Sequence, residues 1–126
     1  MTRRLMKDFL GAALSGLCAI HCAASVLLVA GGGTGVFAFI IESEWIHTVF
    51  AALAVLFAVL SFPAAFRLHQ QVAPTVMGTV GIVLLLAGLV ANPTWEMPLT
   101  VIGAGMAAVA HLWNRNLVNK LEVGLA

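Results

Sequence analysis

The feature that most constrains this chain is a series of four long apolar stretches in a sequence with few charges. Of its 126 residues, 62% are hydrophobic and only 9% are charged, whereas a soluble domain carries about 25% charged residues. The apolar stretches cover approximately residues 9–30, 47–66, 74–91 and 97–117. Because a helix of about 20 residues crosses the roughly 30 Å hydrocarbon core of a bilayer, we expect an all-α bundle of four transmembrane helices in one domain, residues 1–126.

Helix-breaking residues separate these stretches. A glycine-rich segment, residues 31–35, follows the first stretch, and Asn92-Pro93-Thr94 forms a turn before the fourth. Pro74 stands where a helix start tolerates proline, and Pro63 is expected to kink the last turn of the second stretch. The first stretch exceeds the apolar region of about 7–15 residues in a signal peptide, so we interpret it as a retained span.

Charged residues support the same division and give an orientation. With four spans, all six basic residues fall on one side of the membrane: Arg3, Arg4, Lys7, Arg67, Arg115 and Lys120. The carboxylates of Glu42, Glu44 and Glu96 fall on the other side. The positive-inside rule then places both termini in the cytoplasm. The net charge of +1, without a basic run, gives no indication of nucleic-acid binding.

Two cysteines and a histidine form the main candidate site. Cys18 and Cys22 are the only cysteines, and His21 lies between them in the first apolar stretch. Residues four apart lie on one face of a helix, and a residue three apart lies beside them. Thiolate and imidazole are ligands for soft and borderline metals, and an ionisable residue at membrane depth indicates a functional site. We therefore predict an intramembrane metal site at Cys18, His21 and Cys22.

The ligand set favours some metals over others. Thiols one helical turn apart can hold a two-coordinate ion such as Hg(II) or Cu(I), whereas Zn(II) would need further ligands. Apolar surroundings disfavour the thiolate that binds metal, which favours the most thiophilic ion, Hg(II). The alternative is that the cysteines are small buried hydrophobes. A disulfide is disfavoured, because side chains four apart on one helix fit its geometry poorly.

Other polar residues extend the candidate site. His111 lies near the cytoplasmic end of the fourth stretch, within a helical turn or two of the depth of Cys18, so a shared metal site is geometrically possible. The alternative is a structural histidine bonded to a neighbouring backbone group or to Asn114. On the outer side, His47, Glu44 and Glu96 are candidates for collecting the ion. Each also has a structural alternative, namely a solvated loop end for His47 and a helix cap for Glu96.

At these residues the sequence resembles a known family. Residues 15–22, Ser-Gly-Leu-Cys-Ala-Ile-His-Cys, are similar to the first-span motif of the MerC family of small inner-membrane mercury-resistance proteins. The sequence Glu44-Trp45-Ile46-His47, His69, Glu96 and the segment 110–114 also resemble the family pattern. The resemblance implies four membrane helices in the bacterial inner (cytoplasmic) membrane. It also implies transport of mercuric ion, with Cys18 and Cys22 as the metal-binding pair.

The sequence departs from that family in one respect. The family carries further cysteines near the cytoplasmic C-terminus, and residues 116–126 contain none. A second thiol relay toward a cytosolic acceptor, which the sequence does not identify, would therefore be lacking. A MerC-like protein that binds zinc or copper is the corresponding alternative.

Three further interpretations come from other classes. The first is a structural or regulatory membrane subunit in which the cysteines serve packing. An intramembrane redox enzyme is disfavoured, because thiols four apart lack the usual Cys-X-X-Cys geometry. Haem ligation by His21 and His111 has no other sequence signal. We expect no enzyme activity, no permanently bound cofactor and no ATP-driven step, because no phosphate-binding loop is present. The bilayer is the expected surrounding, and a homodimer is compatible with the sequence.

Overall fold

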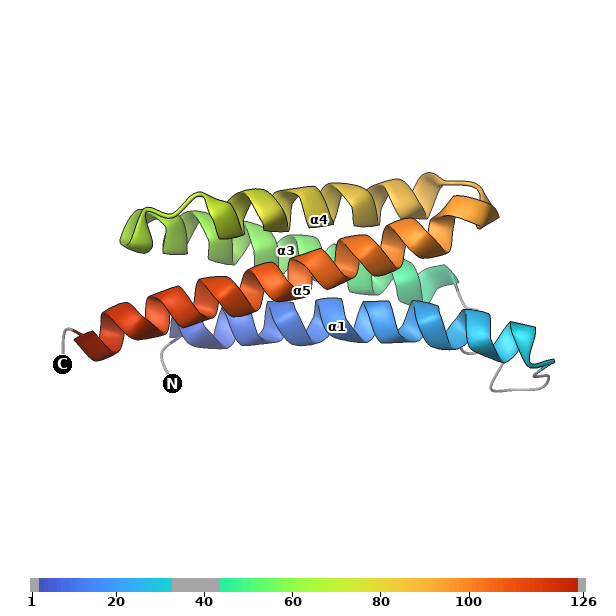
Figure 1. Ribbon diagram of the computed structural model, residues 1–126, viewed down its shortest axis with the longest axis horizontal. Helices are drawn as coiled ribbons and strands as arrows, with labels where there is room; N and C mark the ends of the chain where they lie inside the picture. The colour runs from blue at the N-terminus through green and yellow to red at the C-terminus, as the bar shows by residue number, and fades with distance from the viewer. Residues whose placement is uncertain (1–2, 33–43, 125–126) are drawn as a thin grey trace.

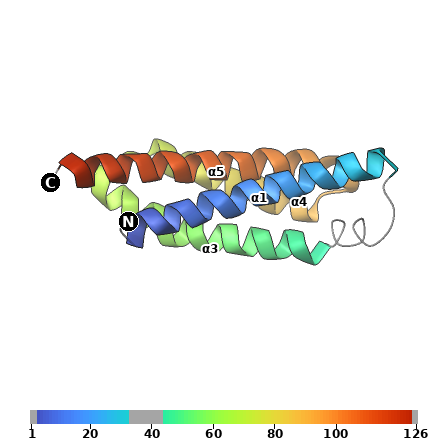
Figure 2. The same cartoon turned by 90° about the horizontal axis from the view of Figure 1, so that it is seen from below.

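The computed structural model describes residues 3–32 and 44–124, which form four α-helices and no strand. These helices are α1 (Arg3–Ala30), α3 (Glu44–His69), α4 (Ala73–Val90) and α5 (Pro93–Gly124). Consecutive helices run antiparallel along a long bundle, so the start of α1 and the end of α5 lie at the same end (Figures 1 and 2). The prediction of an all-α chain is confirmed for these residues. The apolar segment 36–41 lies outside them.

The helices extend beyond the apolar stretches that predicted them. The first helix begins at Arg3 instead of residue 9, and α5 continues to Gly124 instead of ending at residue 117. Backbone hydrogen bonding can continue where side chains become polar, so hydropathy underestimates helix length. Pro63 lies inside α3, which ends only where Gln70 adopts a left-handed conformation (φ 54°) and its N–H donates to Phe66 O at 2.8 Å.

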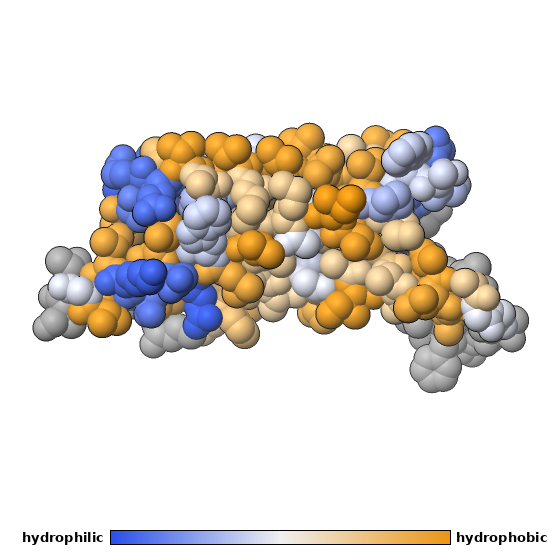
Figure 3. Space-filling model, viewed as in Figure 1, coloured by the Kyte–Doolittle hydropathy of each residue, from blue (hydrophilic) through white to orange (hydrophobic). Residues whose placement is uncertain are grey.

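Three helices in the described residues are long and apolar enough to cross a membrane. They contain the candidate spans Leu5–Leu28 of α1, Trp45–His69 of α3 and Ala73–Val90 of α4. The predicted fourth span, 97–117, is not confirmed by this measure. Helix α5 is less apolar because it carries buried polar side chains, among them Thr100, His111 and Asn114. The face in Figure 3 has a mainly hydrophobic middle, with hydrophilic residues gathered toward its two ends.

Small residues bring α4 and α5 into close contact. Gly81 and Gly103 face each other, and a Cβ added at Gly103 would lie 2.5 Å from Leu85 N and 2.6 Å from Gly81 O. Ala104 and Ala107 of α5 are also fully buried. Such residues let membrane helices approach until their backbones touch. Helix α5 packs extensively against both α4 and α1, which places its polar side chains inside the bundle.

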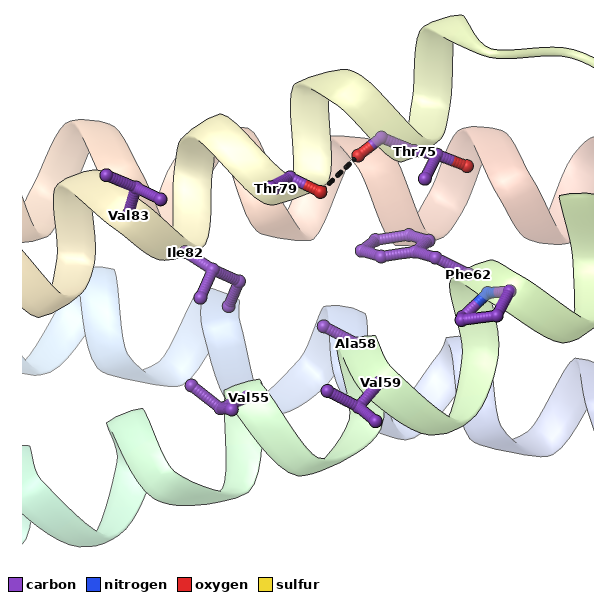
Figure 4. Close-up of a pocket in the computed structure, with 9 residues that line it drawn as sticks. Val55, Ala58, Val59, Phe62, Thr75, Thr79, Ile82 and Val83 are labelled. Carbon is purple, nitrogen blue, oxygen red and sulfur yellow. Dashed lines mark hydrogen bonds between the residues drawn. The ribbon is translucent and has the colours of Figure 1, made fainter.

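The contact between α3 and α4 is looser and leaves an apolar cavity of about 250 Å³ (Figure 4). Its lining includes Val55, Phe62, Ile82 and Val83. The hydroxyl of Thr79, which also lines it, donates to the backbone carbonyl of Thr75 at 2.8 Å. These side chains offer no metal ligand, so this cavity is not the candidate metal site.

The glycine contact predicts a sharp difference between two neighbouring positions. Gly103→Ala should lower the free energy of unfolding by about 1–3 kcal/mol, the usual cost of overpacking a close contact. Gly105→Ala is the matched control, because a Cβ there meets no atom within 4 Å. It should leave stability unchanged or raise it slightly. Unfolding in mixed micelles would measure both, and equal effects would contradict the packing described.

Candidate metal site

Both cysteines lie on the buried face of α1. Cys18 is 1% exposed and Cys22 is 3% exposed. Cys18 belongs to a buried cluster that also contains Ala51 of α3 and Leu85 of α4. The two thiols lie one helical turn apart on this face. The helical spacing of the sequence therefore places two sulfur atoms on one buried side of α1.

The imidazole of His47 joins this pair from the first turn of α3. Its Nε2 lies 3.2 Å from Cys22 Sγ, within hydrogen-bonding distance for sulfur. Its Nδ1 lies 3.6 Å from Glu96 Oε1 at the start of α5. A carboxylate near Nδ1 favours the tautomer with hydrogen on that nitrogen, so that Nε2 can accept the thiol proton. These contacts arrange four side chains in a row from the end of the bundle inward, namely Glu96, His47, Cys22 and Cys18.

A cavity of about 200 Å³ opens onto this row of side chains. It lies where the last part of α1 meets the first turns of α3 and α5. Seven residues line it: Cys22, Ser25, Val26, His47, Pro93, Glu96 and Met97. Cys22 is therefore reachable through the cavity although little of its surface is exposed. Cys18 is not among the lining residues, so of the two cysteine sulfur atoms only that of Cys22 belongs to a residue that lines this cavity.

His21 contacts the imidazole of His47. The two rings pack edge to face, with centroids 4.9 Å apart and planes at 87°, and Phe50 lies beside His21. His21 therefore helps to position His47 as well as flanking the cysteines. Glu42 and the side chain of Glu44 lie outside the described residues, so of the three predicted outer-side candidates the structure places His47 and Glu96.

The structure places His111 in a different group. Its Nδ1 lies 3.1 Å from Asp8 Oδ1, and its ring rests on Gly11. Gly11 precedes Cys18 by seven residues, or about 10 Å along α1. The shared site envisaged from the sequence is therefore not formed. The alternative bond to Asn114 is also not formed, because Asn114 instead donates to both oxygens of Asp8 at 2.9 and 3.0 Å.

Two features of this arrangement were missed by sequence reasoning. Asp8 precedes the first apolar stretch, so hydropathy does not place it inside a span, yet it is 1% exposed. Its separation from Ser15 by seven residues, with Cys18 and Cys22 three and seven further on, places all four on one helix face. That spacing could have identified it. The direct bond between Cys22 and His47 could not be foreseen, because it depends on how α1 and α3 align.

The donor set determines what this site can do chemically. Within the described residues, no group of three or more His, Cys, Asp and Glu side chains is arranged to hold a metal ion. A closed tetrahedral site of the structural zinc type, which needs four ligands, is therefore not preformed there. Two adjacent sulfurs with a neighbouring imidazole instead suit an ion that accepts two thiolates and releases their protons.

One comparison with known proteins identifies the family. The family model described as MerC mercury resistance protein matches residues 8–116, which is most of the chain. The chain therefore belongs to the MerC family, as its sequence motif predicted, and its long apolar helices agree with a membrane protein. No match was found among curated proteins or among solved structures. The matched range includes both cysteines, His47, Glu96 and His111.

The geometry predicts unequal thiol reactivity. In single-cysteine variants, Cys22 (with Cys18→Ser) should react faster with methyl methanethiosulfonate than Cys18 (with Cys22→Ser), because only Cys22 lines the cavity. Adding His47→Gln to the Cys22 protein should slow its reaction by at least about tenfold, since a hydrogen bond to a charged group contributes about 1.5–3 kcal/mol. Equal rates for the two thiols, measured by mass spectrometry in native membranes, would contradict this site.

Proposed function

We propose that this protein carries Hg(II) across the bacterial cytoplasmic membrane, with Cys18 and Cys22 as the intramembrane ligands of the moving ion. One observation carries the proposal: two buried thiols lie one helical turn apart, and the one that is bonded to an imidazole lines a cavity at the end of the bundle. Membership of the MerC mercury resistance family supports mercury as the ion. The metal is the cargo and not a resident cofactor.

In this proposal all four helices cross the membrane and both termini are cytoplasmic. The described basic residues of α1, α3 and α5 belong to the end of the bundle where α1 starts and α5 ends, as the positive-inside rule requires of a cytoplasmic end. Helix α5 crosses with the others because it packs along α1 and α4, and its polar side chains face them instead of lipid. The cavity at Cys22 then opens toward the periplasm.

The proposed uptake begins at this cavity. The carboxylate of Glu96 and the imidazole of His47 attract the cation, and Cys22 is the first thiol it meets. Binding replaces the S–H bond of Cys22 by an Hg–S bond, and the proton passes to His47 Nε2. Cys18 then supplies the second sulfur and loses its own proton. Two thiols and one Hg(II) ion give a neutral bis-thiolate and two protons, so no charge from the ion stays uncompensated in the membrane.

Neutrality of the loaded site favours Hg(II) among the candidate ions. Two thiolates neutralise a divalent ion that accepts linear coordination, whereas Cu(I) with two thiolates would leave a net negative charge in a low-dielectric interior. Zn(II) would require two further ligands, which the described residues do not converge to supply. Delivery on the cytoplasmic side follows by exchange with an external thiol.

Labelled Hg(II) uptake by cells tests this role. Cys18→Ser/Cys22→Ser should reduce uptake to the level of cells without the protein, because no thiol remains in the chain to bind the ion. Ala23→Ser is the matched control, since Ala23 is exposed on the same helix next to Cys22, and it should retain uptake. Equal uptake by the double variant and the native chain at matched membrane levels would rule out the cysteine pathway.

The approach to Cys22 gives a second prediction. His47→Gln should raise the Hg(II) concentration for half-maximal uptake, because the thiol loses its proton acceptor. Glu96→Gln should act in the same direction but by at most about fivefold, since partly exposed ion pairs contribute up to about 1 kcal/mol. Glu122→Gln, in the last turns of α5 at the opposite end, is the control and should change nothing. Saturation curves that are identical for all four proteins would remove His47 and Glu96 from the pathway.

A further inference from the structure

The cavity beside Cys22 is lined by a further sulfur-containing residue, Met97. This residue follows Glu96 directly near the start of α5, and it lines the same cavity of about 200 Å³ as Cys22, His47 and Glu96. Two of these side chains already contact each other, since Cys22 Sγ lies 3.2 Å from His47 Nε2. One cavity therefore brings together a carboxylate, an imidazole, a thiol and a thioether.

The rest of the cavity lining supplies no other soft ligand. The side chains of Val26 and Pro93 have no donor atom, and the hydroxyl of Ser25 already donates to a backbone carbonyl of α1 at 2.8 Å. Hydroxyl and carboxylate oxygens are hard ligands, whereas thiolate and thioether sulfurs are soft. Of the described residues that line this cavity, only Cys22 and Met97 therefore offer a soft atom to an entering ion.

The side chain of Met97 is not committed to the core of the bundle. It is 37% exposed, whereas Met77 of α4 packs against the buried cluster that contains Phe62. Methionine has three rotatable side-chain bonds and a polarisable sulfur, so it adapts its shape easily. Partial exposure beside the cavity thus leaves the thioether of Met97 able to turn toward an ion there.

A thioether and a thiol differ in what they must lose before they bind a metal ion. A thiol must release its proton, and the proton acceptor of Cys22 is the imidazole of His47. A thioether has no proton to release, so it can bind a soft ion at once. It also brings no negative charge, so it holds the ion less tightly than a thiolate does. Rapid capture and easy release are the properties that a ligand at an entrance needs.

We propose that Met97 is the first soft ligand of an entering ion and that it passes this ion to Cys22. The carboxylate of the adjacent Glu96 attracts the ion while the thioether binds it. In the transfer, the Hg–S bond to Met97 breaks, the Hg–S bond to Cys22 forms, and the thiol proton moves to His47 Nε2. Met97 is left as a neutral thioether, and nothing is oxidised or reduced. The transfer rests on the proposed function, whereas binding of a soft cation at Met97 does not.

A thioether at the entrance gives the cavity a selectivity of its own. Thioether sulfur suits soft cations such as Hg(II), Ag(I) and Cu(I). Calcium and magnesium prefer oxygen ligands, and zinc is bound mainly by thiolate, imidazole and carboxylate. A hard cation that Glu96 attracts therefore gains no bond to Met97. Soft ions are selected before they reach the buried thiols.

NMR of protein labelled with ¹³C at the methionine methyl groups tests the binding directly. The protein carries Cys18→Ser/Cys22→Ser, so that no thiol competes, and is studied in lipid nanodiscs. Silver(I) is the probe, in chloride-free buffer that keeps it dissolved. Met97→Leu assigns the Met97 signal, because the signal is absent from that variant. We expect Ag(I) to shift the Met97 signal at concentrations at which Zn(II) leaves it unchanged.

Met6 is the matched internal control for this titration. It is 44% exposed but lies in the first turns of α1, at the opposite end of the bundle from the cavity (Figure 1). Its signal should need at least about tenfold more Ag(I), since removing even the outer partners of a metal site costs about 10–100-fold in affinity. A Met97 signal that Ag(I) does not shift, or that responds no more strongly than that of Met6, would overturn the proposal.

Hg(II) uptake by the chain with both cysteines tests the transfer to Cys22. Met97→Leu, a swap of similar volume that cores tolerate well, should raise the Hg(II) concentration for half-maximal uptake. It should leave the amount of Hg(II) bound at saturation unchanged, because the two thiolates still hold the loaded ion. Met77→Leu, outside the cavity, should change neither quantity.

The outcomes of the uptake experiment separate the two proposals. A half-maximal concentration that Met97→Leu leaves unchanged would overturn the transfer step. A native chain that takes up no Hg(II) would instead contradict the proposed function, and the methyl NMR would still decide whether Met97 binds a soft cation.

Discussion

The structure depends on one constraint, namely that polar atoms on the inner face of α1 must find partners where lipid offers none. Asp8 and Cys22 lie on that face, and their partners come from the neighbouring helices. This explains why α5 is the least apolar of the four helices. It carries His111, Asn114 and Glu96 toward α1 and α3, and the glycine contact with α4 leaves the polar face directed inward.

A carboxylate beside an imidazole occurs in both halves of the bundle. Near the cysteines, Glu96 lies beside His47, whose other nitrogen faces a thiol. In the opposite half, Asp8 binds His111, whose other nitrogen is enclosed. In each pair the carboxylate sets the tautomer of the imidazole and leaves Nε2 as the reactive atom. The first pair lies beside a thiol at a cavity of about 200 Å³, whereas in the second pair Asp8 lines a cavity of only about 20 Å³ and no thiol is bonded to the imidazole.

Much of this could be predicted from the sequence, because hydropathy and helical spacing are local properties. The helices around the four apolar stretches, the placement of Cys18 and Cys22 on one helix face and the presence of Pro74 in the first turn of α4 all followed from such rules. The partners of each polar group did not, because they depend on the register between helices. The sequence therefore allows a metal site shared by His111 and the cysteines, whereas in the structure His111 is bonded to Asp8. Hydropathy likewise could not define α5, whose buried face is polar.

The most direct test of the central claim is the coordination of the bound ion. Mercury L3-edge X-ray absorption of Hg(II)-loaded protein would give the number and type of nearest ligands. The account predicts two sulfur neighbours in near-linear geometry, lost in Cys18→Ser/Cys22→Ser protein and retained in His111→Gln protein. A first shell of nitrogen or oxygen, or the same spectrum from the double cysteine variant, would contradict transport through the cysteine pair.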